Sequence, residues 1–182
     1  MPPDSTQPRR IFLIGFMGAG KTSVGKVLAQ RLAWNFFDLD EVIEQREQKT
    51  VAQIFEQSGE HVFREIESHA LTELLLRSKD GSVIALGGGA FAQPVNRETM
   101  KQAGGVTVLL TAPLEELERR CRAAEGTRPL ARDGDRFREL FASRRNAYAL
   151  AQFHVETLNK EVAEVADEIQ RIPEIGYITA SG

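Results

Sequence analysis

Residues 15–22 read Gly-Phe-Met-Gly-Ala-Gly-Lys-Thr and carry the clearest chemistry in the sequence. They match G-x-x-x-x-G-K-[ST], a glycine-rich turn whose backbone N–H groups converge on phosphate oxygens. The helix that follows would add its positive N-terminus, Lys21 a point charge for the β- and γ-phosphates, and Thr22 a hydroxyl ligand for Mg²⁺. The motif, its flanks and the next residue, Ser23, favour a nucleotide site over a turn that only packs a strand against a helix. The predicted nucleotide-contacting residues are Gly18, Ala19, Gly20, Lys21, Thr22 and Ser23.

A pair of carboxylates, Asp38 and Asp40, follows a second apolar run. Residues two apart on a strand point to the same side, and ligands of an open α/β sheet bind at the carboxyl ends of its strands. One carboxylate could therefore belong to a Mg²⁺ shell while the other meets an acceptor hydroxyl. Taken alone, the pair could also be solvated and simply favour the dipole of the next helix.

Three consecutive glycines, 87–89, end a third apolar run. Glycines allow the backbone to approach a small ligand closely, but they also make tight turns between a strand and a helix. The residues by themselves leave both interpretations open.

The elements that must position these residues alternate along the chain. Extended apolar runs occupy residues 10–14, 36–38, 82–86, 106–110 and 153–156, and between them lie longer segments of helical period, such as 23–32 and 62–76. Thr50 and Gln53 have the spacing of a capping box, and Asn159 is a candidate cap for a last helix. The alternation predicts an α/β fold around a parallel sheet.

Length and composition predict one globular domain. The chain has 182 residues, 42% of them hydrophobic, and 23 basic against 26 acidic residues, so no global positive field exists to hold a nucleic acid. One cysteine cannot form an internal disulfide, and no apolar run approaches the roughly 18 residues of a membrane span. We expect a cytoplasmic protein without nucleic-acid or membrane partners, with a disordered tail at 1–9, a domain at 10–173 and a tail at 174–182.

Five motifs in fixed order resemble the shikimate kinase family over nearly the whole chain. They are GFMGAGKTSVG, FFDLD, GEHVFREIE, LGGGA and TRPL. The resemblance implies a P-loop, nucleoside-monophosphate-kinase-like fold of three layers with a five-stranded parallel sheet, and a lid at about 122–135. It implies an enzyme that phosphorylates the 3-hydroxyl of shikimate with ATP and Mg²⁺, in the aromatic amino acid (chorismate) pathway. We also expect a monomer.

On the substrate side, the resemblance assigns Asp40 as the general base for the reacting hydroxyl. Arg64 and Arg144 would clamp the substrate carboxylate, because a guanidinium donates two parallel hydrogen bonds to such a group. Arg145 competes with Arg144, although the Arg-x-x-x-Tyr spacing to Tyr148 favours Arg144. The backbone platform beneath the substrate would be Gly87, Gly88 and Gly89.

On the nucleotide side, the resemblance places Thr22 and Asp38 at the metal. It places Arg120 against the adenine ring. Arg128, together with Lys21, would contact the transferring phosphoryl group. The arginine-rich segment 119–138 lacks apolar periodicity, so we expect a mobile surface element that becomes ordered when Arg128 meets the phosphates.

Two other functions stay possible from the sequence. One is another kinase of the same fold, either for a small metabolite, such as a gluconate kinase, or for a nucleotide. The other is a module that binds ligand without catalysis, but Lys21, Asp40, Arg64 and Arg128 are all present, and such a module should have lost at least one of them.

Overall fold

The computed structural model describes residues 10–78, 81–124 and 133–176. Its centre is a five-stranded sheet in the order β2-β3-β1-β4-β5, and all four strand pairings are parallel. The predicted α/β fold with a five-stranded parallel sheet is therefore confirmed. The strands are β1 (Arg10–Ile14), β2 (Asn35–Asp38), β3 (Ser82–Ala85), β4 (Val106–Thr111) and β5 (Phe153–Glu156).

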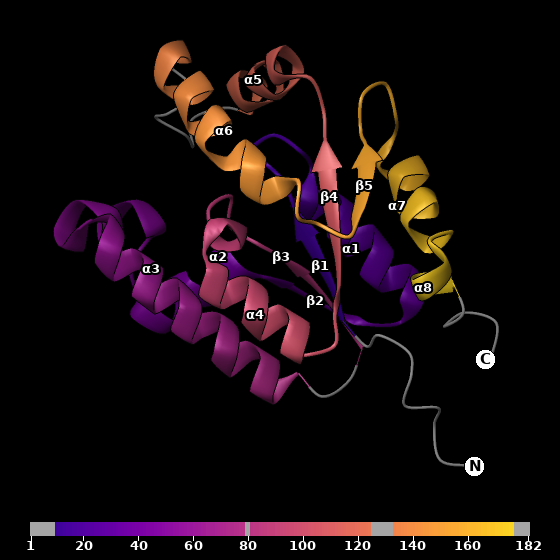
Figure 1. Cartoon of the computed structure of the whole chain (residues 1–182), viewed down its shortest axis with the longest axis horizontal. Coiled ribbons are helices and arrows are strands. Elements are labelled where there is room, and N and C mark those ends of the chain that lie inside the picture. Colours follow the sequence, from indigo (N-terminus) through magenta and orange to yellow (C-terminus); the bar gives the residue numbers. More distant parts are fainter. Residues whose placement is uncertain (1–9, 79–80, 125–132, 177–182) are drawn as a thin grey trace.

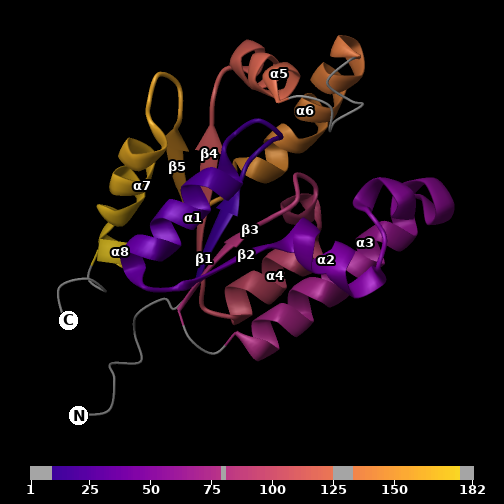
Figure 2. The same ribbon diagram turned by 180° about the vertical axis from the view of Figure 1, so that it is seen from behind.

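Helices cover both faces of this sheet (Figures 1 and 2). Helices α1 and α7 pack against each other on one face, and α4 and the second half of α3 lie on the other. The helical segments are α1 (Lys21–Leu32), α2 (Leu39–Glu47), α3 (Val51–Arg77), the 3₁₀ turn η1 (Ala90–Ala92), α4 (Pro94–Gln102), α5 (Leu114–Ala123), α6 (Gly134–Tyr148), α7 (Val162–Gln170) and α8 (Pro173–Gly176). None of the helices in the described ranges is both long enough and apolar enough for a membrane span.

The inner strands read as continuous apolar runs because the sheet is covered on both sides. Ile11, Phe12, Leu13 and Ile14 of β1 are at most 1% exposed, and every residue of β3 is buried. Strand β2 at the edge is only partly buried. The hydrophobic core thus fixes the strand ends, and with them the loops that follow.

The ends of the helices agree only in part with the sequence predictions. The predicted capping box is present: the Gln53 backbone N–H donates to Thr50 Oγ1 (3.2 Å), and the Thr50 N–H donates to Gln53 Oε1 (2.9 Å). Asn159 does not cap α7, because it lies in a left-handed turn (φ 56°), and Glu161 is the N-cap. At the other end of this region, Ile175 in α8 is fully buried, two residues beyond the domain limit predicted at 173.

Helix α3 is broken at Gly59, whose backbone (φ 78°, ψ 174°) leaves the helical region. Positive φ at low cost is the property of glycine that this break requires. The predicted helix at 62–76 therefore begins earlier, and a further helical stretch precedes the break. The break separates Phe55 from Phe63, yet their rings meet at 4.4 Å between centroids.

Candidate functional site

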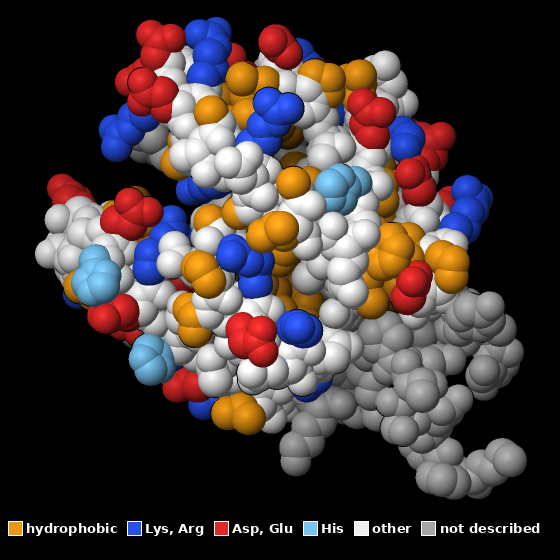
Figure 3. Space-filling view, viewed as in Figure 1, with side chains coloured by type: hydrophobic (Ala, Val, Ile, Leu, Met, Phe, Trp, Pro, Cys, Tyr) orange, Lys and Arg blue, Asp and Glu red, His pale blue; other side chains and the backbone are white. Residues whose placement is uncertain are grey.

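The site lies at the carboxyl edge of the sheet, where β1, β2 and β3 end. There the surface is hollowed between α3 and the α5–α6 pair, and basic side chains stand at the wall of the hollow (Figure 3). Loops of an open parallel sheet meet at this edge, so residues that are distant in sequence become neighbours.

The phosphate loop connects β1 directly to α1. Gly18 and Gly20 adopt positive φ (83° and 88°), and a Cβ on Gly18 would lie 2.7 Å from the backbone oxygen of Leu117. Among the described side chains none caps α1 at Gly20, so the N–H groups of its first turn can serve an anion. Lys21 Nζ donates to the backbone oxygens of Gly15 (2.8 Å) and Phe16 (3.2 Å), which holds its charge at the loop.

The two aspartates belong to different elements, contrary to the prediction that both point the same way from one strand. Strand β2 ends at Asp38, and Asp40 lies in the first turn of α2. Asp38 caps this helix, because its Oδ1 accepts the Asp40 N–H (3.1 Å), while its Oδ2 accepts the Thr22 hydroxyl (2.8 Å). Asp38 therefore faces the phosphate loop, whereas Asp40 is turned toward Gly87.

The three glycines leave room for four charged side chains. A Cβ on Gly87 would lie 2.6 Å from Asp40 Oδ1 and 3.1 Å from Glu67 Oε1. A Cβ on Gly88 would collide with the Arg144 guanidinium, and one on Gly89 with that of Arg64. The segment is thus both a strand-to-helix turn and the point where two acids and two arginines converge.

Arg64 is held tightly from its own helix. Its guanidinium donates to Glu67 Oε2 (2.8 Å) and Glu60 Oε1 (3.2 Å), and it stacks over the rings of Phe55 and Phe63, 5.8 and 5.2 Å from their centroids. Burial opposes the charge, but the two carboxylates outweigh it and raise the pKa of Arg64. The side chain is only 14% exposed, so most of it is covered by the protein.

Glu67 is a site residue that the sequence analysis missed. It is completely buried, and its Oε1 finds no hydrogen-bond partner among the described residues. Burial raises the pKa of Glu67, with Asp40 adding to the effect and Arg64 and Arg144 opposing it. The i,i+3 spacing from Arg64 to Glu67 on a predicted helix was the available signal.

Arg144 lies on α6 against Gly88 and is half-buried, whereas the neighbouring Arg145 is exposed. One helical turn later, the Tyr148 hydroxyl donates to the backbone oxygen of Gly88 (2.5 Å). Burial raises the pKa of Tyr148 to about 12, although Arg144 opposes the shift. The end of α6 is therefore fastened to the glycine turn.

A cavity of about 450 Å³ lies beside the phosphate loop, lined by residues of that loop, of α5 and of the segment leading into α7. Arg120 forms part of its wall and donates to Thr157 Oγ1 (2.9 Å), to the Thr157 backbone oxygen (3.0 Å) and to Glu116 (2.6 Å). Hydrogen bonds from Arg119 and Arg120 lower the pKa of Glu116 to about 2. Arg128 lies outside the described residues, as does most of the predicted lid.

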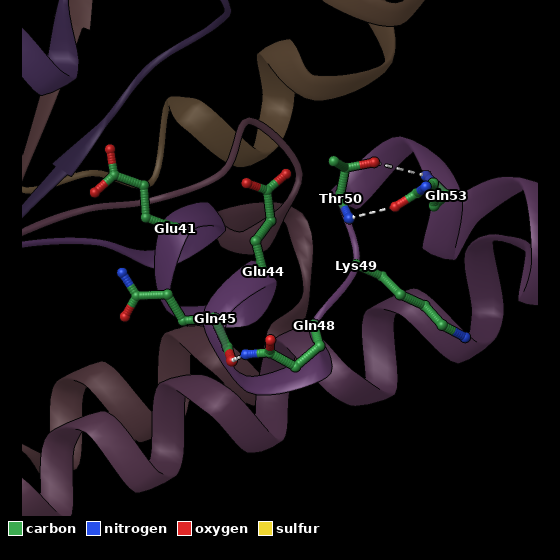
Figure 4. Close-up of a pocket in the computed structure, with 7 residues that line it drawn as sticks. All are labelled: Glu41, Glu44, Gln45, Gln48, Lys49, Thr50 and Gln53. Atoms are coloured by element: carbon green, nitrogen blue, oxygen red, sulfur yellow. Dashed lines mark hydrogen bonds between the residues drawn. The ribbon is translucent and has the colours of Figure 1, made fainter.

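A second hollow lies between α2 and the start of α3, away from these groups (Figure 4). Several of its polar atoms already form hydrogen bonds within the protein: Thr50 and Gln53 cap α3, and Gln48 donates to the Gln45 backbone oxygen (2.6 Å). The lining includes neither the phosphate loop nor the glycine turn. Its lining residues are Glu41, Glu44, Gln45, Gln48, Lys49, Thr50 and Gln53.

The chain is similar to proteins of a known family. The family model described as shikimate kinase matches residues 17–173. A shikimate kinase of Geobacter sulfurreducens is 41% identical over 164 residues, covering 88% of each chain, and one of Persephonella marina is 38% identical over 161 residues, covering 88% of this chain and 96% of the other.

Solved structures agree with the sequence relatives. The shikimate kinase of Bacteroides thetaiotaomicron superimposes with a TM-score of 0.81 at 36% identity, covering 88% of this chain and 96% of the other. The shikimate kinase of Acinetobacter baumannii in complex with shikimate superimposes with a TM-score of 0.80 at 38% identity, covering 90% of this chain and 91% of the other. A gluconokinase from Sinorhizobium meliloti superimposes with a TM-score of 0.62 at 16% identity, covering 96% of this chain and 93% of the other. This likeness shows a shared fold alone.

Proposed function

The chain belongs to the shikimate kinase family and has shikimate kinase activity in aromatic amino acid biosynthesis, and from this premise we propose how its residues transfer the γ-phosphoryl group of ATP to the 3-hydroxyl of shikimate. One observation carries the proposal: Asp40, Arg64 and Arg144 converge on Gly87–Gly89 at the same sheet edge as the phosphate loop. An acid, two cations and a phosphate site are what an anionic acceptor alcohol and a nucleotide require.

Shikimate would lie over the glycine turn with its carboxylate between Arg64 and Arg144. The relative from Acinetobacter baumannii was solved with shikimate, which supports this ligand for the homologous chain. Both guanidiniums are near the glycines, that of Arg64 from α3 and that of Arg144 from α6. Bidentate hydrogen bonding to a carboxylate then fixes the orientation of the ring.

Asp40 would take the proton of the 3-hydroxyl as the oxygen attacks the γ-phosphorus. The new O–P bond forms while the bond between that phosphorus and the β,γ-bridging oxygen breaks, and ADP leaves. Lys21, held at the phosphate loop, would move its charge from the Gly15 and Phe16 carbonyls to the phosphates. Its role is to neutralise charge, because little covalent work falls to the protein in phosphoryl transfer.

The residues present fit a Mg²⁺ ion. Thr22 Oγ1 and Asp38 Oδ2 are 2.8 Å apart, and both are oxygen groups of the kind this cation prefers. Among the described residues no group of three or more His, Cys, Asp or Glu could hold a metal by itself, which suits an ion shared with phosphates. Thr22 would hold the ion and Asp38 would support it from the outer shell. When bound, Mg²⁺ neutralises charge that develops on the phosphate oxygens.

On the nucleotide side, Gly18, Ala19 and Gly20 border the cavity that would receive ATP, together with Ser23 and Arg120. The proposal for Arg128 as a phosphate-facing lid residue rests on the sequence resemblance alone. We also propose that the chain acts as a monomer. Light scattering in solution should give about the chain mass of 20.2 kDa.

Steady-state kinetics of two variants test the proposal. Asp40→Asn should lower kcat by about 10²- to 10⁴-fold, because it removes the proton acceptor. Arg64→Ala should chiefly raise the KM for shikimate, by about 10-fold or more, because the carboxylate loses a charged partner. Arg145→Ala, an exposed neighbour of the clamp, is the matched control and should change neither value.

A coupled ADP-release assay should be run with shikimate, gluconate and AMP supplied separately, with and without Mg²⁺. Turnover is expected with shikimate and Mg²⁺. Small, equal changes of kcat and KM in both variants would remove the roles given to Asp40 and Arg64.

A further inference from the structure

Arg144 rests on an aromatic ring that belongs to the phosphate loop. Its guanidinium carbon is 5.5 Å from the centroid of Phe16, a side chain only 2% exposed. A cation within about 6 Å of a ring face is attracted to it, and the attraction grows when water is excluded. Phe16 therefore touches the substrate side of the site through its ring, while its backbone oxygen holds Lys21 on the nucleotide side.

The ring of Phe16 is fixed by α6 itself. Phe137 and Phe141 meet it edge-on, at 5.0 and 5.3 Å between centroids and with interplanar angles of 82° and 87°. Phe137, Phe141 and Arg144 are spaced by four and three residues, so they share one face of α6. The ring and the guanidinium are thus parts of one packed unit.

The two arginines of the clamp are held by different means. Arg64 has two carboxylate partners, whereas no described carboxylate forms an ion pair with Arg144. A carboxylate partner would compete with an incoming carboxylate and offset the charge of the arginine. A ring face orders the guanidinium without neutralising its charge, and a hydrogen bond with the Tyr148 side chain occupies only part of its five N–H donors.

We propose that Phe16 is a positioning residue for Arg144, and that the phosphate loop thereby builds part of the acceptor site. The inference rests on the proposed role of Arg144 in binding the substrate carboxylate. The ring face keeps the guanidinium beside Gly88 before the substrate arrives, so less side-chain entropy is lost on binding.

Fluorinated phenylalanines at position 16 test the electrostatic part of this proposal. Fluorine withdraws electron density from the ring face while it changes the ring's size little. Incorporation of mono-, di- and trifluorophenylalanine should raise the KM for shikimate stepwise, to about 2- to 10-fold for the trifluoro ring. The KM for ATP and kcat should stay nearly constant. A KM for shikimate that does not follow fluorination would overturn the proposal, because simple packing by Phe16 predicts no such series.

Two substitutions complement the fluorinated series. Phe16→Leu should raise the KM for shikimate about 3- to 10-fold through loss of the ring. Phe141→Leu is the matched control, because it removes one edge contact of the same ring without touching the cation, and it should change this KM less than 2-fold. Thermal denaturation of each variant reports whether it is folded. If Phe16→Leu does not fold, the fluorinated series still tests whether the ring face of Phe16 positions Arg144.

Arg144→Ala separates the inference from the function on which it rests. If Arg144→Ala leaves the KM for shikimate unchanged, the clamp role of Arg144 fails, and the role of Phe16 falls with it. If Arg144→Ala raises this KM while the fluorinated series and Phe16→Leu do not, Arg144 is a clamp that needs no help from Phe16.

Discussion

Lys21 serves phosphates and not the core, because its ammonium contacts backbone oxygens of the loop that it follows. Lys21→Ala should therefore lower kcat by about 10²-fold or more without unfolding the chain. The ADP-release assay measures the rate, and circular dichroism checks the fold. Lys26→Ala removes an exposed cation from the same helix and should leave the rate unchanged. A folded Lys21→Ala variant with wild-type turnover would make the loop a purely structural turn.

Glu67 should make stability depend on pH in an unusual direction. Because burial raises its pKa, the folded state binds its proton more tightly than the unfolded state does. Its contribution to the free energy of unfolding therefore falls as pH rises from the ordinary carboxyl value near 4.5 through the raised value. Wild-type protein should lose stability relative to Glu67→Gln across this window.

Urea denaturation of the wild type and of Glu67→Gln at several pH values gives the free energy of unfolding of each protein. Subtracting one free energy from the other cancels the contributions of the other titrating groups. The lowered pKa of Glu116, for example, is common to both chains. If the difference in free energy of unfolding between the two proteins stays constant with pH, Glu67 has the same pKa in the folded and the unfolded state.

At the scale of elements, Tyr148 fastens the end of α6 to the glycine turn. Tyr148→Phe should lower the free energy of unfolding by about 1–2 kcal/mol, because the Gly88 oxygen loses its donor inside the protein. Ser143→Ala removes an exposed hydroxyl from the same helix, where it bonds only to Leu140 of its own turn, and should cost much less. Equal losses in urea titrations of the two variants would mean that the Tyr148 bond does not hold α6 in place.

At the scale of the whole molecule, the sheet edge brings two separable ligand sites together. A nucleotide analogue with Mg²⁺ at about 100 times its Kd should stabilise the wild type by about 2.7 kcal/mol, and shikimate should act likewise. Lys21→Ala should lose most of the nucleotide shift and keep the shikimate shift, whereas Arg64→Ala should do the reverse. Thermal denaturation reads both shifts, and loss of both in one variant would contradict separate sites.

The sequence by itself determined the five strands and the phosphate loop. Strand β1 is a continuous apolar run that any doubly covered sheet requires, and the loop from Gly15 to Thr22 is a contiguous motif whose backbone binds the anion. Local patterns of this kind survive folding because each depends on neighbours along the chain. The resemblance then extended the prediction to Asp40, Arg64 and Arg144.

Only the tertiary structure decided which side chains meet. Asp40 lies in α2 and not in the strand, because Asp38 caps that helix. The two carboxylates therefore face different partners. Glu67 became a site residue through its burial beside Asp40 and the two arginines. Phe16 and Arg144 are 128 positions apart, and no local pattern relates them. Contacts between distant segments depend on how α6 packs over the sheet edge, a property of the packed core and not of any one stretch of sequence.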